Sequence, residues 1–318
     1  MTGFVHLRLH TEYSLVDGIV RIPELMQAVT AARMPAVALT DQSNLFGMVK
    51  FYKEAQAAGI KPLIGVDAWI REPGERTPAS RLVLLCQPIV PIRHGARVER
   101  HFELLLRMRD ENGRIVSPDN FMSAAERYNI MPNIDRWVIE NALRWLVSEA
   151  DEREKLAMCS INLSGQSLGD DKFLPFVIDQ FHRSGLDATK ICFEITETAA
   201  IASFSQANRF IQALKELGCK FALDDFGTGL SSFGYLKHFP VDFLKIDGSF
   251  VKEILHDPID REMVRSINEI GHLTGKQTIA EFAENAEIIT MLRSLGVDYA
   301  QGYGISMPQR VLKAANIA

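Results

Sequence analysis

Residues 220–247 decide the fold, and they read KFALDDFGTGLSSFGYLKHFPVDFLKID. Two apolar runs in this stretch, Lys220–Phe226 and Phe243–Asp247, predict buried β-strands that end in charged residues. Runs of the same kind recur on both sides of it. They are Leu82–Ile89, His101–Met108, Lys155–Asn162, Lys190–Glu197, Gln277–Phe282 and Tyr299–Tyr303.

Helical patterns separate many of these runs. Apolar residues recur at helical spacing in Ile134–Ser148, Phe173–Ser184, Gln206–Leu217, Asp260–Thr274 and Ala286–Leu295. Eight strands with helices between them predict an α/β fold, a (β/α)8 TIM-type barrel over residues 81–318. A doubly wound open sheet is the alternative.

Residues 1–85 carry a shorter alternation of strand-like and helix-like runs. Its order favours a partial α/β segment with parallel strands. The runs are Val5–His10, Ile22–Ala32, Ala36–Thr40, Phe46–Ala58 and Pro62–Ile70. The stretch Arg71–Ser80 (REPGERTPAS) is charged and contains two prolines and a glycine. We therefore predict two domains, 1–80 and 81–318.

The composition excludes several classes of protein. Hydrophobic residues make up 47% and charged residues 24%, which is the balance of a globular chain. The net charge of −5 argues against a basic surface for duplex nucleic acid. No apolar run is long enough to cross a membrane, and four widely spaced cysteines fit a reducing compartment. We expect a cytoplasmic protein without a membrane partner.

Polar side chains end most of the predicted barrel strands. Because the carboxyl ends of barrel strands meet at one face, these side chains should converge. Several carboxylates at one place repel each other unless a cation lies between them. The residues are Asn162, Glu194, Glu197, Asp224, Asp225, Lys245, Asp247, Glu281 and Gln301, with Glu103 inside the second run.

The chemistry of this set points to hard divalent cations. Carboxylate and amide oxygens suit Mg²⁺ or Mn²⁺ better than zinc. The Asp224-Asp225 pair could serve two ions that clamp a phosphoryl group, and Lys245 could hold a water molecule or a phosphate oxygen. Alternatively, Asp-Asp-Phe-Gly-Thr-Gly is only a turn. The whole set on successive strands favours the metal site, since a buried acidic cluster without an ion is costly.

The ordered motifs resemble the EAL family of cyclic-di-GMP phosphodiesterases from about Arg81 to Pro308. Glu103-Leu104-Leu105-Leu106-Arg107 stands at the motif that names the family. The other matching segments are Gln87-Pro88-Ile89, Asn162-Leu163-Ser164, Glu194-Ile195-Thr196-Glu197, Asp224-Asp225-Phe226-Gly227-Thr228-Gly229, Lys245-Ile246-Asp247, Glu281-Phe282-Ala283-Glu284 and Gln301-Gly302-Tyr303.

The resemblance implies metal-dependent hydrolysis of cyclic di-GMP to linear pGpG with two Mg²⁺ or Mn²⁺ ions. It assigns catalysis to Lys245 and Glu281, and substrate binding to Arg107 and Gln87. It is also compatible with a homodimer. The residues implied to support the Asp-Asp-Phe-Gly loop are Glu197, Glu284 and Asp247. The implied metal ligands are Glu103, Asn162, Glu194, Asp224, Asp225 and Gln301.

Two positions depart from the family's pattern. Leu104 replaces a small alanine, and Phe282-Ala283 replaces Gly-Val between two late glutamates. Neither change removes a ligand, so we interpret both as packing changes in an enzyme. A catalytically silent cyclic-di-GMP receptor is the second interpretation.

Residues 1–85 resemble the opening of the PHP domain of the bacterial replicative DNA polymerase III alpha subunit. The matching segments are His6–Ser14, Leu39–Gly47 and Gly65-Val66-Asp67. Arg8 and Gln42 stand where metal-binding members commonly carry histidine, which implies a metal-free version of about the first third of that domain. We expect residues 1–80 to fold poorly or to pack on the barrel. A replication-associated role in binding a partner is the third interpretation.

The histidines give no convincing metal site. His6 and His10 could share an ion, but two histidines on one strand face without further ligands are the preferred interpretation. The other six are predicted to lie at the surface or in loops: His94, His101, His182, His238, His256 and His272.

Overall fold

The computed structural model describes residues 9–11, 20–41, 47–65, 82–93, 95, 100–110, 113–149, 154–228 and 233–311. The chain divides into two compact units. One contains Met1–Val83 and Arg107–Tyr128, and the other contains Leu84–Leu106 and Asn129–Ile317. The boundary predicted between residues 80 and 81 stays a prediction.

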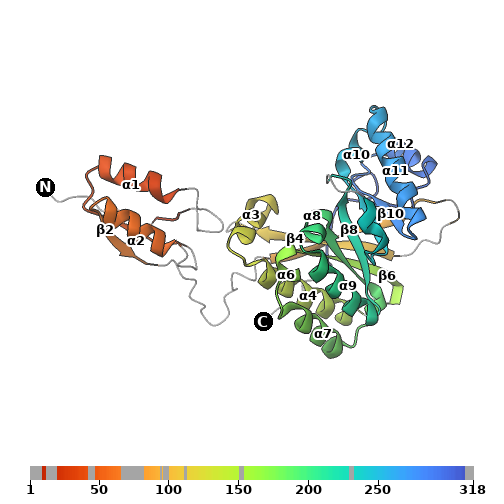
Figure 1. Cartoon of the computed structure of the whole chain (residues 1–318), viewed down its shortest axis with the longest axis horizontal. Helices are drawn as coiled ribbons and strands as arrows, with labels where there is room; N and C mark the ends of the chain where they lie inside the picture. Colours follow the sequence, from red (N-terminus) through yellow and green to blue (C-terminus); the bar gives the residue numbers. More distant parts are fainter. Residues whose placement is uncertain are drawn as a thin grey trace. The chain divides into compact units, whose positions relative to one another are not determined.

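The first unit begins with a small α/β layer, coloured red to orange in Figure 1. Strand β1 pairs in parallel with β2, from Ala36 opposite Lys61 to Leu39 opposite Ile64. The predicted alternation of helices and strands is present from Ile22 to Ile64. Most of the predicted strand Val5–His10, the stretch Arg71–Ser80, Arg8 and Gln42 lie outside the described residues. The elements are α1 (Ile22–Ala31), β1 (Ala36–Leu39), α2 (Met48–Ala57) and β2 (Lys61–Ile64).

The second part of that unit follows the end of a barrel strand. Strand β5 (Ile115–Val116) pairs antiparallel with the end of β4 (Arg100–Arg109), where Met108 lies opposite Val116. Helix α3 (Asp119–Arg127) comes next along the chain.

The second unit is built on the predicted eight-stranded closed barrel. Strands β4 and β6 to β11 run parallel in chain order, and β3 pairs with both β11 and β4, which closes the ring. β3 runs antiparallel to β11, so the chain needs no crossover helix between β3 and β4. The remaining strands are β3 (Leu82–Pro91), β6 (Leu156–Leu163), β7 (Ile191–Thr196), β8 (Lys220–Phe226), β9 (Phe243–Ile246), β10 (Gln277–Ala280), β11 (Tyr299–Ala300) and β12 (Gln309–Arg310).

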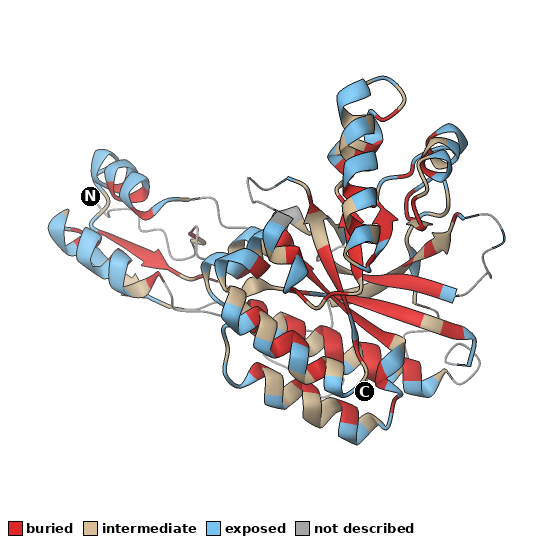
Figure 2. Cartoon of the chain, turned by 45° about the vertical axis from the view of Figure 1, so that its right-hand side comes forward, coloured by how far each residue is buried: buried red, intermediate tan, exposed pale blue. Residues whose placement is uncertain are grey.

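Helices cover the barrel strands, so the strands are buried on both faces. All four residues of β9 and the first five of β7 are buried, and Figure 2 shows buried strands surrounded by helices with exposed outer faces. The helices of the unit are α4 (Met131–Ser148), α6 (Gly165–Leu168), α7 (Phe173–Ser184), η2 (Ala188–Lys190), α8 (Glu197–Ala202), α9 (Phe204–Glu216), η3 (Phe233–Lys237), α10 (Gly248–Lys252), α11 (Pro258–Leu273) and α12 (Ala286–Ser294). No helix in the part of the chain just described is long and apolar enough to span a membrane.

The barrel interior contains an apolar layer next to the polar strand ends, each member an even number of positions from one of the polar residues. It comprises Ile89, Met158, Cys192, Ala222, Phe243 and Ile279, with Tyr299 packed against them. Side chains an even number of positions apart on a strand share a face, so this layer lies on the same inner face as those polar residues.

Among the described histidines that are predicted to lie at the surface or in loops, His101 is buried, so the prediction is wrong for it, and His94 lies outside the described residues. Its ring is buried 5.8 Å from Tyr299 and 6.0 Å from Phe243, measured between centroids. The reason is that His101 precedes Glu103 by two residues on β4 and shares its inward face. Burial, assisted by the positive charge of Lys245, lowers the pKa of His101 to about 3.

Candidate active site

A buried lysine surrounded by carboxylates forms the centre of the candidate site. Lys245 on β9 is fully buried, and its Nζ lies 2.5 Å from Glu194 Oε2 and 2.7 Å from Glu281 Oε1. The same nitrogen lies 3.0 Å from Asp224 Oδ1 and 3.5 Å from Glu103 Oε2. These five residues come from five strands or strand ends, which meet because the barrel closes.

Two amide side chains bridge the acidic residues to neighbouring strands. Asn162 Nδ2 donates to Glu103 Oε1 at 2.5 Å, and Asn162 lies opposite Glu194 in the β6–β7 ladder. Gln301 Nε2 donates to Glu103 Oε2 at 2.7 Å and to Gln87 Oε1 at 3.2 Å. The closed barrel therefore brings together residues that are almost 200 positions apart in the chain.

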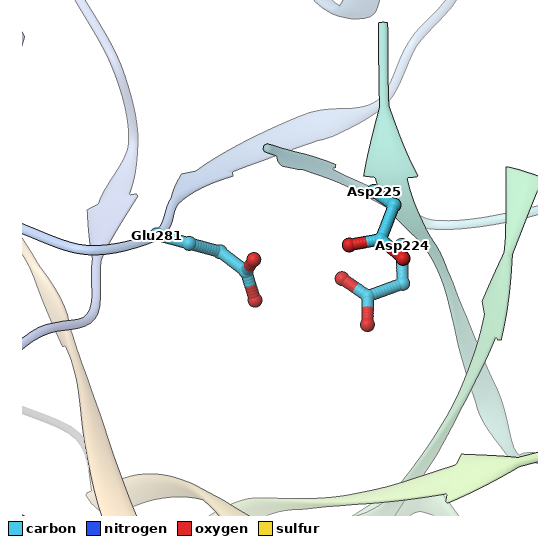
Figure 3. A group of neighbouring side chains, drawn as sticks. All are labelled: Asp224, Asp225 and Glu281. Carbon is cyan, nitrogen blue, oxygen red and sulfur yellow. The ribbon is translucent and has the colours of Figure 1, made fainter. Parts of the chain in front are cut away.

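Asp224 and Asp225 both face the site although they are consecutive. Successive residues of a regular strand point to opposite faces, but the β8–β9 ladder is irregular between Leu223 and Phe226. Asp225 has φ 54°, in the left-handed region that aspartate tolerates better than most residues. The carboxylates of Asp224, Asp225 and Glu281 consequently point toward one another in Figure 3, and each offers an oxygen within 4.8 Å of the others.

The electrostatics of the cluster shift several pKa values. Burial raises the pKa of Asp225 to about 6, and the nearby charges of Asp224 and Asp247 add to this. Burial also raises the pKa of Glu194 and Glu281, against the opposing effect of Lys245.

Lys245 itself stays protonated. Burial acts to lower its pKa, but Asp224, Glu103, Glu194 and Glu281 together raise it well above the ordinary value for lysine. Its ammonium group therefore holds the carboxylates together by charge and by hydrogen bonds.

Two buried oxygens of the cluster have no hydrogen-bond donor among the described residues. They are Glu194 Oε1 and Gln301 Oε1, whereas Asp224 Oδ1 has Lys245 Nζ at 3.0 Å. Leaving a buried acceptor without a partner costs about 1–3 kcal/mol. Such acceptors within a group of carboxylates are the pattern that an oxygen-ligated cation would satisfy. The residues present thus fit a divalent metal site.

Glu197 connects the two ends of the Asp-Asp-Phe-Gly loop. Its Oε2 accepts a hydrogen bond from the Gly227 backbone N–H at 3.1 Å, and its Oε1 accepts one from the Tyr235 hydroxyl at 2.7 Å. The side chain of Glu197 is buried at the start of α8. Tyr235 was missed by the sequence analysis, and its place just after the motif is the signal that could have found it.

The other predicted site residues have different surroundings. Gln87 is buried and donates from Nε2 to the Ser306 carbonyl at 3.0 Å, in addition to its contact with Gln301. The Asp247 side chain accepts from the Ser249 N–H at 2.8 Å and so caps α10.

For two of the predicted site residues, Glu284 and Arg107, the structure describes no contact with the acidic cluster. Glu284 is exposed, and within the described ranges no contact joins its side chain to the Asp-Asp-Phe-Gly loop. Arg107 lies four residues after Glu103 on β4, within the segment that belongs to the first compact unit. The roles predicted for both residues stay predictions.

The fold and the site define this chain as a closed α/β barrel protein with an acidic, metal-binding type of site at the ends of its strands. Comparison with known families identifies which barrel family it is. The family model described as the EAL domain matches residues 75–308, so the chain belongs to the EAL domain family. A model described as the PHP domain matches residues 6–108. The two matches overlap over residues 75–108.

Named relatives support this membership. Cyclic di-GMP phosphodiesterase PdeB of Shewanella oneidensis is 40% identical over 241 residues, which cover 76% of this chain and 28% of the relative. Cyclic di-GMP phosphodiesterase PdeF of Escherichia coli is 38% identical, over 74% of this chain and 31% of the relative. The chain thus spans about a third of the length of these curated relatives.

Solved structures show the same barrel. The EAL domain of FimX from Pseudomonas aeruginosa, bound to c-di-GMP, matches with a TM-score of 0.66 and 32% identity over 72% of this chain and 91% of that one. The EAL enzyme Bd1971, bound to cAMP and cyclic di-GMP, matches with a TM-score of 0.67 and 32% identity over 73% and 63% of the two chains.

Proposed function

We propose that this chain hydrolyses one phosphodiester bond of cyclic di-GMP and releases linear pGpG. The observation that carries the proposal is the buried Lys245 among carboxylate and amide groups, two of whose oxygens, Glu194 Oε1 and Gln301 Oε1, have no donor among the described residues. The named relatives support the substrate, and the complete set of ligand-type residues favours an enzyme over a silent receptor.

Two Mg²⁺ or Mn²⁺ ions are the cofactors that this donor set fits. The residues that would hold them are Glu103, Asn162, Glu194, Asp224, Asp225 and Gln301. When bound, such ions generate a water nucleophile near neutral pH and offset charge on the phosphate. Asp225, which faces the site with a left-handed backbone conformation, is assigned to the second ion as the family resemblance implies.

The remaining residues orient the attacking water, bind the substrate and support the Asp-Asp-Phe-Gly loop. Lys245, held protonated by its carboxylates, orients the attacking water, and Glu281 beside it acts as a further ligand or as the base that receives the proton. Arg107 binds a substrate phosphate and Gln87 lines the substrate site. Glu197 holds the loop ends at Gly227 and Tyr235, and Asp247 and Glu284 support the same loop.

The proposal extends to the location and the oligomeric state of the protein, a cytoplasmic homodimer. The reducing compartment indicated by its cysteines supports a cytoplasmic site of action, and the resemblance supports a homodimer. Light scattering of the purified chain, with and without Mn²⁺ and substrate, tests the homodimer directly.

A turnover assay tests the activity, with chelator and a variant of a proposed metal ligand as controls. Purified protein is incubated with cyclic di-GMP and Mn²⁺, with and without chelator, and pGpG is followed by chromatography. We expect metal-dependent pGpG that disappears in Glu103→Ala. Binding of cyclic di-GMP without any turnover would instead support the receptor.

A further inference from the structure

Two residues near the acidic cluster have an unusual backbone conformation. Among the described non-glycine residues, positive φ occurs at Arg33, Asn129, Asp225 and Phe282. Asp225 belongs to a residue type that tolerates this region, whereas a bulky aromatic residue there is a true outlier. Phe282, with φ 51°, directly follows Glu281. Such strain persists only where the surroundings impose it, and it concentrates at functional sites.

The backbone around Phe282 is held from three sides. Glu281 N–H donates to the Ile246 carbonyl at 3.3 Å, Ala283 N–H donates to the Gln301 carbonyl at 2.9 Å, and Gly304 N–H donates to the Ala283 carbonyl at 2.9 Å. These bonds do not depend on the side chain at position 282. Since the Phe282 residue is 48% exposed, core packing does not explain an aromatic ring there.

The ring contacts both ends of one short helix. A Cβ placed on Gly248, the first residue of α10, would lie 2.0 Å from Phe282 Cδ2. At the other end of α10, Lys252 Nζ lies 4.1 Å from the centre of the ring, which is a cation–π contact. A helix of five residues has little stability of its own, so contacts with its surroundings fix its position.

Helix α10 leads directly to the acidic cluster. Asp247 precedes it and caps it through the Ser249 N–H, and the Asp247 N–H donates to the carbonyl of Phe226, the residue after Asp225, at 3.5 Å. The contacts thus lead from Phe282 through Gly248 and Asp247 to Phe226, the neighbour of Asp225 in the chain.

We propose that Phe282, assisted by Lys252, is a positioning residue that fixes α10 and thereby holds Asp225 in place for the second divalent ion. This inference rests on the metal site of the proposed function. Groups that orient metal ligands typically change metal affinity by about 10-fold to 100-fold when they are removed.

The first test is Phe282→Gly in the full chain. Glycine keeps the backbone conformation without strain, so we expect a melting temperature equal to or above that of the unchanged protein. Titration with Mn²⁺, with free Mn²⁺ counted by electron paramagnetic resonance, should show the Asp225 site, which we expect to be the weaker of two, loosened about 10-fold. The tighter site should be unchanged. A lower melting temperature with unchanged Mn²⁺ binding would show that the ring is purely structural.

The second test is a rescue cycle at the contact itself. Gly248→Ala places a methyl group against the ring, and we expect it to loosen the weaker Mn²⁺ site. In the Phe282→Gly background the methyl group meets no ring, so the double variant should bind Mn²⁺ like Phe282→Gly alone. Additive losses would overturn the proposal.

Matched controls separate this proposal from the proposed function. Asn129→Gly removes a side chain at φ 54° elsewhere in the barrel unit and should leave Mn²⁺ binding unchanged. Lys252→Met should loosen the weaker site less than Phe282→Gly does. If the unchanged protein binds two Mn²⁺ ions and Phe282→Gly binds both equally well, only the positioning role is overturned. If the unchanged protein binds no Mn²⁺, the proposed function and this inference fail together.

Discussion

The small α/β layer and the barrel share an alternation of strands and helices but differ in how completely their strands are paired and buried. In the layer, β1 is fully buried, but β2 is exposed or half-buried at every position and leaves Ile64 42% exposed. In the barrel, each of the eight strands has a neighbour on both sides. Closing a sheet removes its edges, whereas the two strands that the structure describes in the layer form an open sheet. The difference teaches that ring closure, more than local pattern, makes the barrel a rigid support for a site.

The two regions also differ in whether their buried carboxylates have hydrogen-bond donors. In the layer, Asp41 is buried and accepts hydrogen bonds from the Thr11 N–H at 2.6 Å and from the Thr11 hydroxyl. In the barrel, Glu194 keeps one carboxylate oxygen, Oε1, without a donor among the described residues. A carboxylate satisfied by its own neighbours is structural, and one left unsatisfied is available for a ligand.

Lys245→Met should have the largest effect on the barrel. The variant removes the ammonium group that contacts Glu103, Glu194, Asp224 and Glu281, so their mutual repulsion rises and the water loses its orienting charge. We expect turnover to fall by at least about 10²-fold, measured as pGpG released. The control Lys220→Met, on a half-exposed lysine of β8, should keep full activity; comparable loss in both variants would refute the role of Lys245.

Limited proteolysis tests the comparison of the two regions directly. Because the layer has an exposed edge strand and a small core, we expect trypsin to remove residues 1–80 while the barrel remains intact. Mass spectrometry of the digestion products identifies the surviving fragment. Equal resistance of both regions would show that the layer is as stable as the barrel.

Metal should stabilise the barrel and leave the layer unchanged. At an Mn²⁺ concentration 100 times the dissociation constant, a ligand bound only by the folded state adds about 2.7 kcal/mol, which raises the melting temperature by roughly 5–10 °C for a unit of this size. Differential scanning calorimetry with and without chelator measures the shift. It should vanish in Glu103→Ala, and an equal shift there would place the bound ion elsewhere.

Tyr235→Phe should have the smallest effect. It removes one hydrogen bond to the buried Glu197, worth about 1 kcal/mol, and loosens one end of the loop. We expect kcat to fall roughly threefold to tenfold. The matched control is Tyr52→Phe on α2, whose hydroxyl accepts from Gln56 at 3.2 Å in an exposed position. Turnover equal to the unchanged protein in Tyr235→Phe would show that Glu197 needs only Gly227.

Most of the barrel could be predicted because its signals are local. Strand Lys220–Phe226 and helices Phe173–Ser184 and Ala286–Ser294 begin and end within one residue of the periodic patterns that predict them. Strand β10 is shorter than predicted and ends at Ala280, just before the positive φ of Phe282. A dihedral angle at one residue leaves no periodic signal, so the pattern could not show it.

By itself, the sequence determined the eight strands, the identity of the polar residues at their ends and the class of ion that those residues suit. These properties depend on residue type and on a period of two, which can be read along the chain. Only the tertiary structure decided the antiparallel first strand, the burial of His101, the inward turn of both Asp224 and Asp225, and the contact of Phe282 with α10. Ring closure brings together residues that are far apart in the chain, and a single backbone angle reorients a side chain. Neither effect leaves a pattern in the local sequence.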